Sequence, residues 1–346
     1  MTTLTSPHDL LAAVPFLIGY HPTNSLVIVS LKEDAIGMAM RVDYPDLQLA
    51  NELAGNTAHD EDYDSLIFHL VREGAEGALL VAYAPEGRND GEEILSNIAM
   101  AMSRAQIPLR ESLLITDGKW RSVICADLDC CPAEGRNLPE IISSRVAVEQ
   151  VAQGRPMPFA NLAGMSESIA PLPLSNDLDF LATVHSFVID PESAELQLSE
   201  RMGATSVIDL VARFVEGSIG RDFESDQELS ARVIASVGDI QVRDFALGSH
   251  DEISIDFYWA MWHYLTRVAP AGFVAPLASL LAALSYERGE GAFAQRSLDR
   301  ALADNPSYSL ASLLRRVFSA GWPPESFAAM RKDLHPKVCA GIFADE

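Results

Sequence analysis

The feature that most constrains the fold is a change of pattern near the middle of the chain. The segment QGRPMPFANLAGMSESIAPLPLSN, residues 153–176, is rich in proline, glycine and other turn-forming residues. Proline and glycine interrupt regular structure, so a dense run of them is typical of a connection between folded units. We therefore predict a linker at 156–176, a first domain at 1–155 and a second at 177–346. A chain of 346 residues has room for two domains.

Before this linker, short aliphatic runs alternate with amphipathic segments. Runs rich in β-branched and aliphatic residues predict buried strands, and an Asp-Gly pair between two of them predicts a hairpin turn. This alternation favours an α/β domain with a mixed sheet of about five strands and helices packed on it. The predicted strands are 25–31, 36–44, 77–84 and two within 111–127 around Asp117 and Gly118, with helices at 46–58, 63–75 and 93–106.

Two helix ends have clear signals. Ser6 before Pro7 is typical of a helix start, and Gly19 is a plausible end of the same helix. Asp90 followed by Glu93 matches a capping box, in which the first side chain bonds to the main chain of the helix that it begins.

After the linker every periodic segment predicts a helix, and none predicts a strand. The second domain is therefore expected to be all-α. The predicted helices are 177–190, 193–202, 204–219, 225–238, 251–268, 272–287, 290–304, 308–320 and 324–332.

One helix pair in this domain has a sharper pattern, which resembles a tetratricopeptide unit. Small residues let two antiparallel helices approach, leucines fill the groove and a proline ends the second helix. Because a solenoid needs about three repeats, a single pair serves either as a helical hairpin in the domain core or as a peptide-binding groove. The pattern residues are Leu281, Ala282, Ala294, Leu298, Ala301 and Pro306.

The charge balance limits the partners. With 49 acidic and 25 basic side chains, the formal net charge is −24. Such a charge repels phosphate, so we expect no binding to nucleic acid or to an anionic membrane and favour a basic partner. The longest apolar stretch, 272–286, is shorter than a spanning helix requires, and the N-terminal apolar run lacks a basic flank and a cleavage site. We predict a cytoplasmic protein.

Three of the four cysteines fall in WRSVICADLDCCPAEGR, residues 120–136. Zinc needs four ligands, and the spacing of Cys125, Cys130 and Cys131 is not the usual pair of pairs. Adjacent cysteines also diverge in extended backbone. A metal site would need oxygens from the loop or a contribution from the C-terminal segment. Those further ligands are Asp127, Asp129, Glu134, His335 and Cys339.

The other interpretations of the cysteines remain open. A disulfide from Cys125 to Cys130 or Cys131 fits the loop length but not a reducing compartment. A redox switch is disfavoured because the nearby aspartates raise thiol pKa values. The simplest interpretation is that these side chains are small buried hydrophobic groups at the end of a strand.

Three loops could form a ligand pocket at one edge of the sheet: 19–25, 84–91 and 125–136. Ligands often bind outside strand ends in open α/β sheets. The chain has no nucleophile elbow, phosphate loop or dinucleotide fingerprint, so we assign no catalytic residue and expect no cofactor. The candidate ligand-binding residues are His21, Ser25, Arg88, Arg121 and Glu134.

An aromatic segment, DFYWAMWHY at 256–264, places Trp259 and Trp262 at helical spacing. The two tryptophans form either a core stripe or an exposed patch for a partner or for a second copy of the chain.

Three segments carry a family resemblance: VPFLIGYHPTNSLVIVSL, WRSVICADLDCCPAEG and ALSYERGEGAFAQRSLDRALADNPSYSLASLL. Together they resemble an actinobacterial family known as a domain of unknown function. The resemblance implies an actinobacterial, cytoplasmic origin and no particular activity. The expected function is a non-enzymatic protein-interaction or regulatory module. The alternatives are a small-molecule sensor or enzyme with the three-loop pocket, and a protein that self-assembles through its helical domain.

Overall fold

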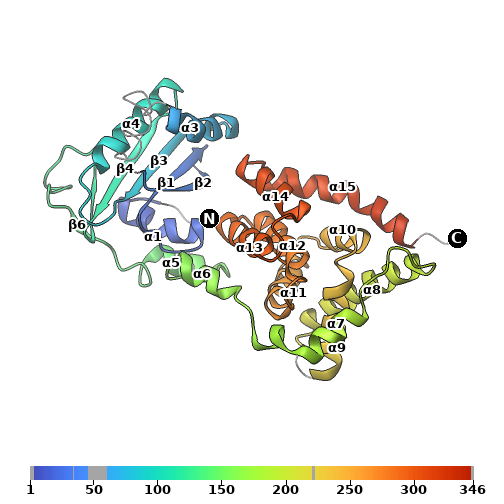
Figure 1. Ribbon diagram of the computed structural model, residues 1–346. Helices are drawn as coiled ribbons and strands as arrows, with labels where there is room; N and C mark the ends of the chain where they lie inside the picture. The colour runs from blue at the N-terminus through green and yellow to red at the C-terminus, as the bar shows by residue number, and fades with distance from the viewer. Residues whose placement is uncertain (1–3, 34, 46–60, 220–222, 344–346) are drawn as a thin grey trace. The chain divides into compact units, whose positions relative to one another are not determined.

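The computed structural model describes residues 4–33, 35–45, 61–219 and 223–343 (Figure 1). The chain divides into two compact units, Met1–Gly164 (unit 1) and Met165–Glu346 (unit 2). The division falls inside the segment 156–176 for which we predicted a linker. This segment is not wholly irregular, because it contains α6 (Leu162–Ser168) and the 3-10 helix η1 (Pro173–Asn176).

Unit 1 contains a mixed six-stranded sheet in the order β2-β1-β3-β4-β5-β6, with helices packed on it (Figure 1). The α/β fold class predicted from the sequence is confirmed. Its elements are α1 (Pro7–Ile18), β1 (Ser25–Lys32), β2 (Ala35–Asp43), α3 (Glu61–Glu73), β3 (Gly77–Tyr83), α4 (Gly91–Arg104), β4 (Leu109–Thr116), β5 (Lys119–Ser122), β6 (Arg136–Asn137) and α5 (Arg145–Ala152).

The pairing of the strands explains the sheet. β1 lies between β2 and β3 and is antiparallel to both, whereas β3 and β4 are parallel neighbours connected through α4. The β4–β5 hairpin turns at Asp117 and Gly118, both with positive φ, as their sequence predicted. The sixth strand, β6, was not predicted because two residues give no periodic signal.

Each face of the sheet is covered by a pair of helices. Ile28 and Leu80 pack with Leu70 of α3 and Ile94 of α4 in one buried cluster. On α1, residues such as Ala12 pack against α5. β1 is buried along its first six residues, so side chains on both of its faces are covered.

The helix ends in unit 1 follow the sequence in one case and depart from it in the other. Ser6 caps α1 by accepting a hydrogen bond from the Asp9 amide at 3.2 Å, and Gly19 ends the helix with φ 85°. The capping-box prediction at Asp90 is wrong, because that side chain makes no capping hydrogen bond to α4 and bonds to other side chains instead. The helix predicted at 46–58 lies outside the described residues.

Unit 2 is helical, and none of its described residues lies in a strand. α8 continues through Gly203, where we expected a break, α10 was not predicted, and α15 continues past Pro336. The helices are α7 (Leu178–Ser186), α8 (Leu196–Val215), α9 (Phe223–Ser236), α10 (Ile240–Gly248), α11 (Ile255–Val268), α12 (Val274–Glu287), α13 (Gly291–Asp304), α14 (Ser309–Ser319) and α15 (Pro324–Phe343).

α12 is the central helix of unit 2, because every residue from Val274 to Ser285 is buried. α13 packs along it after a connection of three residues, and α10, α11, α14 and α15 also contact it. The Asp304 carboxylate at the end of α13 accepts hydrogen bonds from the amides of Gly272, Val274 and Ala275 at 2.7–3.0 Å, which fixes the start of α12. Among the described residues, no helix combines the length and hydropathy needed to cross a bilayer.

Candidate functional site

The cysteine loop, residues 123–135, connects β5 to β6 in unit 1. Because Trp120 of β5 pairs with Arg136 of β6, the loop returns to the strand that it left. Gly135 permits this return: its φ is 74°, and a Cβ at this position would lie 3.1 Å from the carbonyl oxygen of Trp120. The local sequence therefore folds the loop back beside β5.

Hydrogen bonds within the loop fix its backbone. The Asp127 carboxylate accepts hydrogen bonds from the amides of Asp129 at 2.9 Å and Cys130 at 3.4 Å. The main-chain carbonyl of Asp127 accepts a third from the Cys131 amide at 2.7 Å. The Arg136 guanidinium donates to the carbonyl oxygens of Cys130 at 2.7 Å and Asp129 at 2.8 Å. The position of the turn that contains the adjacent cysteines is therefore set on both sides.

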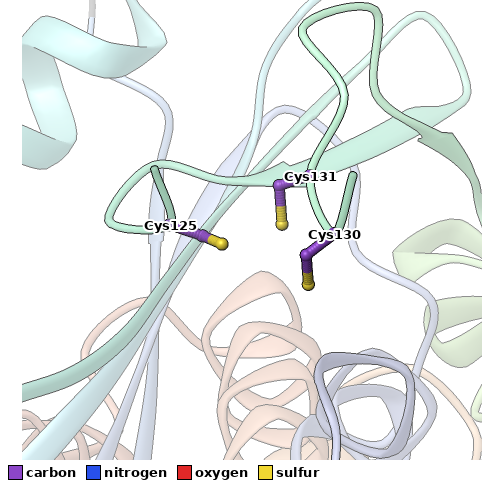
Figure 2. A group of neighbouring side chains, drawn as sticks. All are labelled: Cys125, Cys130 and Cys131. Carbon is purple, nitrogen blue, oxygen red and sulfur yellow. The ribbon is translucent and has the colours of Figure 1, made fainter. Parts of the chain in front are cut away.

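The cysteine loop brings three sulfur atoms together. The Sγ atoms of Cys125, Cys130 and Cys131 all lie within 4.8 Å of one another, and Figure 2 shows them facing one shared space. We expected adjacent cysteines to diverge in extended backbone, but residues 128–130 form a turn. Cys131 is buried, Cys125 half-buried and Cys130 exposed, so the interpretation as buried hydrophobic groups fits Cys131 alone.

The cause of the thiol pKa shift differs from the one that the sequence indicated, which was the nearby aspartates. Burial raises the pKa of the Cys131 thiol, and hydrogen bonds with Cys125 and Cys130 raise it further. The Asp127 carboxylate is turned to backbone amides. Arg136 was missed as part of the loop because it lies beyond the last cysteine, although its guanidinium contacts the carbonyl of Cys130.

Chemically, three thiols at this separation are suited to bind one soft metal ion or to form a disulfide between two of them. Among the described residues, no histidine nitrogen or carboxylate oxygen joins the three sulfurs as a further member of the group. His335 and Cys339, considered as ligands from the sequence, lie on α15 in contact with each other, with 3.3 Å between Nε2 and Sγ. All four cysteines are free thiols.

The predicted ligand-binding residues do not gather at one point. Ser25 pairs with Tyr83, so loops 19–25 and 84–91 meet at the end of the sheet where β3 finishes. β5 runs away from that end, but loop 125–136, which contains Glu134, folds back. Arg136 pairs with Trp120, and Trp120 pairs with Ile115, the partner of Tyr83. The register therefore brings loops 19–25 and 84–91 together and places the end of the third loop three strands away from β3 along the sheet.

The loops that do meet are closed by their own contacts. The Ser25 side chain is buried, and its Oγ has no hydrogen-bond partner among the described residues. The His21 amide donates to the Phe159 carbonyl at 3.0 Å, and burial lowers the pKa of the His21 imidazole. His21 therefore lies in the segment before β1 that bonds to Phe159, and Ser25 is the buried first residue of that strand.

The arginines predicted to bind a ligand are each paired with a carboxylate. Arg88 forms an ion pair with Asp90, which also accepts a hydrogen bond from the Tyr44 hydroxyl at 3.0 Å. Burial and the bond to Asp90 raise the pKa of Tyr44. Arg121 forms an ion pair with Glu92 in the first turn of α4. The Tyr44–Arg88–Asp90 cluster had no motif that could have revealed it.

The aromatic segment belongs mostly to the core of unit 2. Trp262 is fully buried, so it is a core residue and not part of a partner surface. Trp259 is half-buried; its Nε1 donates to Ser285 Oγ at 2.8 Å, and its ring stacks on His263 with centroids 5.0 Å apart. Helical spacing alone could not separate these two environments.

A buried charged cluster in unit 2 was missed by the sequence analysis. The Glu287 carboxylate accepts from Arg331 Nε at 2.8 Å and lies 3.0 Å from His250 Nε2. Arg331 also donates to the carbonyls of Gly248 and His250, and the three side chains are at most 6% exposed. Residues so far apart in the chain give no local pattern.

Fold and site together define a class: a mixed α/β unit with a three-cysteine loop, followed by a helical unit. Over residues 7–325 the chain matches the family described as a domain of unknown function, DUF4192. The chain belongs to this family, which confirms the expectation of a domain of unknown function. No curated protein matches the chain, and no solved structure does.

Proposed function

We propose that this protein is a non-enzymatic regulatory module that acts by binding another protein. The observation that carries the proposal is a concentration of exposed aliphatic side chains between β5 and the end of α5. Leu128 is 70% and Ile142 72% exposed. Six exposed aliphatic side chains within 28 residues are more than the single scattered ones that need no explanation. The exposed aliphatic residues of this segment, which we call the apolar segment, are Ile124, Leu128, Leu138, Ile142, Val148 and Val151.

The charge of the protein indicates the kind of partner. A net charge of −24 attracts a basic protein and repels an acidic one. The partner surface that fits is therefore apolar at its centre and basic at its rim. The ion pairs of Arg88 with Asp90 and of Arg121 with Glu92 further favour an interaction module, because they occupy the cations proposed for an enzyme pocket.

The test is site-specific photo-crosslinking in the host cell, followed by binding measurements with purified proteins. A photoreactive residue replaces Ile142 in one variant and Ile253, which is 86% exposed in unit 2, in the control. We expect one discrete crosslinked protein from position 142 and none from 253. With the purified partner, Leu128→Glu and Ile142→Glu should each weaken binding at least about tenfold, while Ile253→Glu leaves it unchanged. Equal crosslinking at both positions would contradict the proposal.

A small-molecule sensor is the second candidate, because loops 19–25 and 84–91 meet beside the Tyr44–Arg88–Asp90 cluster. Self-assembly through the helical domain has less support, because Trp262 is buried. Thermal stabilisation by a cell metabolite extract, lost in Arg88→Met, would favour the sensor. A monomer by light scattering at high concentration would remove self-assembly.

The proposal also includes the source, the compartment and the tetratricopeptide-like helix pair expected from the sequence. An actinobacterial, cytoplasmic protein fits the resemblance of the three segments and the presence of free thiols. A tetratricopeptide-like α12–α13 pair is supported by the burial of Ala282, Ala294, Leu298 and Ala301. Since α12 is covered along its length, we assign this pair the role of a core hairpin and not of a peptide groove.

A further inference from the structure

We propose that Cys125, Cys130 and Cys131 bind one thiophilic d10 metal ion, Zn(II) or Cu(I), through three thiolates, with one coordination position open to an outside ligand. This inference is independent of the proposed partner-binding function. It starts from the three Sγ atoms that lie within 4.8 Å of one another and face one space (Figure 2).

The separation of the sulfurs is close to what one ion requires. A zinc–sulfur bond is about 2.3 Å long, so thiolates around a tetrahedral zinc lie about 3.8 Å apart. The three Sγ atoms therefore need to approach by on the order of 1 Å, a movement within reach of cysteine side-chain rotation. Soft thiolate ligands select Zn(II) and Cu(I) over hard cations such as magnesium and calcium.

The loop backbone is built to keep the sulfurs convergent. The turn at 128–130 points two consecutive cysteines to the same side, and Asp127 and Arg136 hold that turn by hydrogen bonds on either side. Ser122 Oγ accepts from the Cys125 amide at 3.2 Å and donates to Glu111 at 2.7 Å, which fixes the first cysteine against the sheet. The ligands are therefore held by contacts that do not involve the sulfurs.

Burial and charge agree with such a site. Cys131 is buried and Cys130 exposed, so an ion bound between them has a closed side and a side open to solvent. That open side provides the remaining coordination position. Three thiolates give the complex a net charge of −1 with Zn(II) or −2 with Cu(I), and the Arg136 guanidinium on the Cys130 carbonyl partly offsets it.

The binding step releases protons and changes no oxidation state. Each neutral thiol loses one proton as its sulfur bonds to the ion, so one ion displaces up to three protons to solvent. Because protons compete with the ion for the three sulfurs, binding weakens as the pH falls. No oxidant or reductant takes part.

The test uses the full-length protein, reduced and freed of metal under argon. Native mass spectrometry and competition with a chromophoric chelator follow titration with Zn(II) and, separately, with Cu(I). We expect one ion per chain and a release approaching three protons in a weakly buffered solution. Alkylation mapping should show Cys125, Cys130 and Cys131 protected and Cys339 unchanged. The ion that remains bound against the stronger chelator identifies the preferred metal.

The matched variants separate binding from folding. Cys130→Ser, at an exposed position, should weaken binding at least about 100-fold, whereas Cys339→Ser should leave it unchanged. Circular dichroism and the thermal midpoint of Cys130→Ser should match those of the parent, so that loss of binding does not reflect unfolding. Binding of equal strength in Cys130→Ser, or no bound ion after titration with either metal, would overturn the proposal.

Discussion

The buried cluster of His250, Glu287 and Arg331 shows what single residues contribute in unit 2. Taking charged groups out of water costs several kcal/mol per ion, and the cost is offset only by close opposite charges and hydrogen bonds. Although burial raises the pKa of the Glu287 carboxyl, hydrogen bonds from His250 and Arg331 outweigh it and hold the pKa below its usual value. The charged Glu287 carboxylate on α12 and the Arg331 guanidinium on α15 therefore connect these two helices.

The first prediction concerns Arg331. Replacing it by Met leaves the Glu287 carboxylate buried without its cation, so the free energy of unfolding should fall by about 3–5 kcal/mol. The measurement is the urea midpoint followed by circular dichroism. Lys332→Met is the control, because Lys332 is next in sequence but pairs with the exposed Glu252. The double variant Arg331→Met with Glu287→Met should regain part of the loss. Equal effects of Arg331→Met and Lys332→Met would contradict this account.

The second prediction concerns acid. Burial lowers the pKa of the His250 imidazole, and the Arg331 guanidinium lowers it further, against the hydrogen bond to Glu287. Below about pH 6.5 the unfolded chain therefore binds a proton that the folded chain does not, and stability falls as the pH decreases. His250→Asn should flatten the decrease in thermal midpoint between about pH 7.5 and 5.5. Some slope should remain, because burial also lowers the pKa values of His21, His263 and His335. A slope identical to that of the parent would rule out His250 as a cause.

The sequence could identify the three cysteines as a group but not their geometry. Spacing alone favoured diverging side chains, and only the turn at 128–130 makes the adjacent sulfurs converge. The sequence did not reveal the partners of the predicted pocket residues for a related reason. Arg88 and Arg121 are polar and near strand ends, but the carboxylates with which they form ion pairs are set by tertiary packing. Motifs identify the residue types, and packing decides their neighbours.

Among the secondary-structure elements, α8 shows how a glycine can be misinterpreted. The predicted helices 193–202 and 204–219 leave Gly203 between them, yet α8 continues through it. The glycine is needed for packing, because a Cβ there would lie 2.7 Å from Cβ of Ser236 on α9 and 3.2 Å from Val242 on α10. The sequence predicted the helix type correctly and placed its ends wrongly. α10 was missed for a different reason, since nine residues give a weak periodic signal.

The third prediction tests this packing. Alanine has a higher helix propensity than glycine by about 1 kcal/mol, so propensity alone predicts that Gly203→Ala stabilises the protein. We expect the opposite, a loss of about 1–3 kcal/mol from overpacking against α9 and α10. Gly291→Ala is the control, because a Cβ at this position, in the first turn of α13, would meet no described side chain within 4 Å. The measurement is the urea midpoint of each variant. Stabilisation by both substitutions would contradict the close approach.

For the whole molecule, the dominant quantity is its net charge of −24. Like charges repel more strongly in the compact state than in the unfolded chain, and salt screens this repulsion. The fourth prediction is that the thermal midpoint rises when NaCl is increased from low to near-physiological concentration. Choline chloride should give the same rise, because screening does not depend on the cation. An increase seen with NaCl alone would instead indicate a specific sodium site, and a decrease would show that ion pairs outweigh the repulsion.

The antiparallel pairing of β1 with β3 also has a consequence for biogenesis. Ser25 pairs with Tyr83 on the neighbouring strand, 58 residues later in the chain, whereas the most extensive contacts of α12 are with α11 and α13, the helices directly before and after it. Chains with distant contacts fold more slowly than chains with local ones. Translation proceeds from the N-terminus, so the slower unit emerges from the ribosome first. Unit 1 can therefore begin to fold while the ribosome synthesises some 180 residues of unit 2. The slowly forming sheet gains this time before the helices of unit 2 are complete.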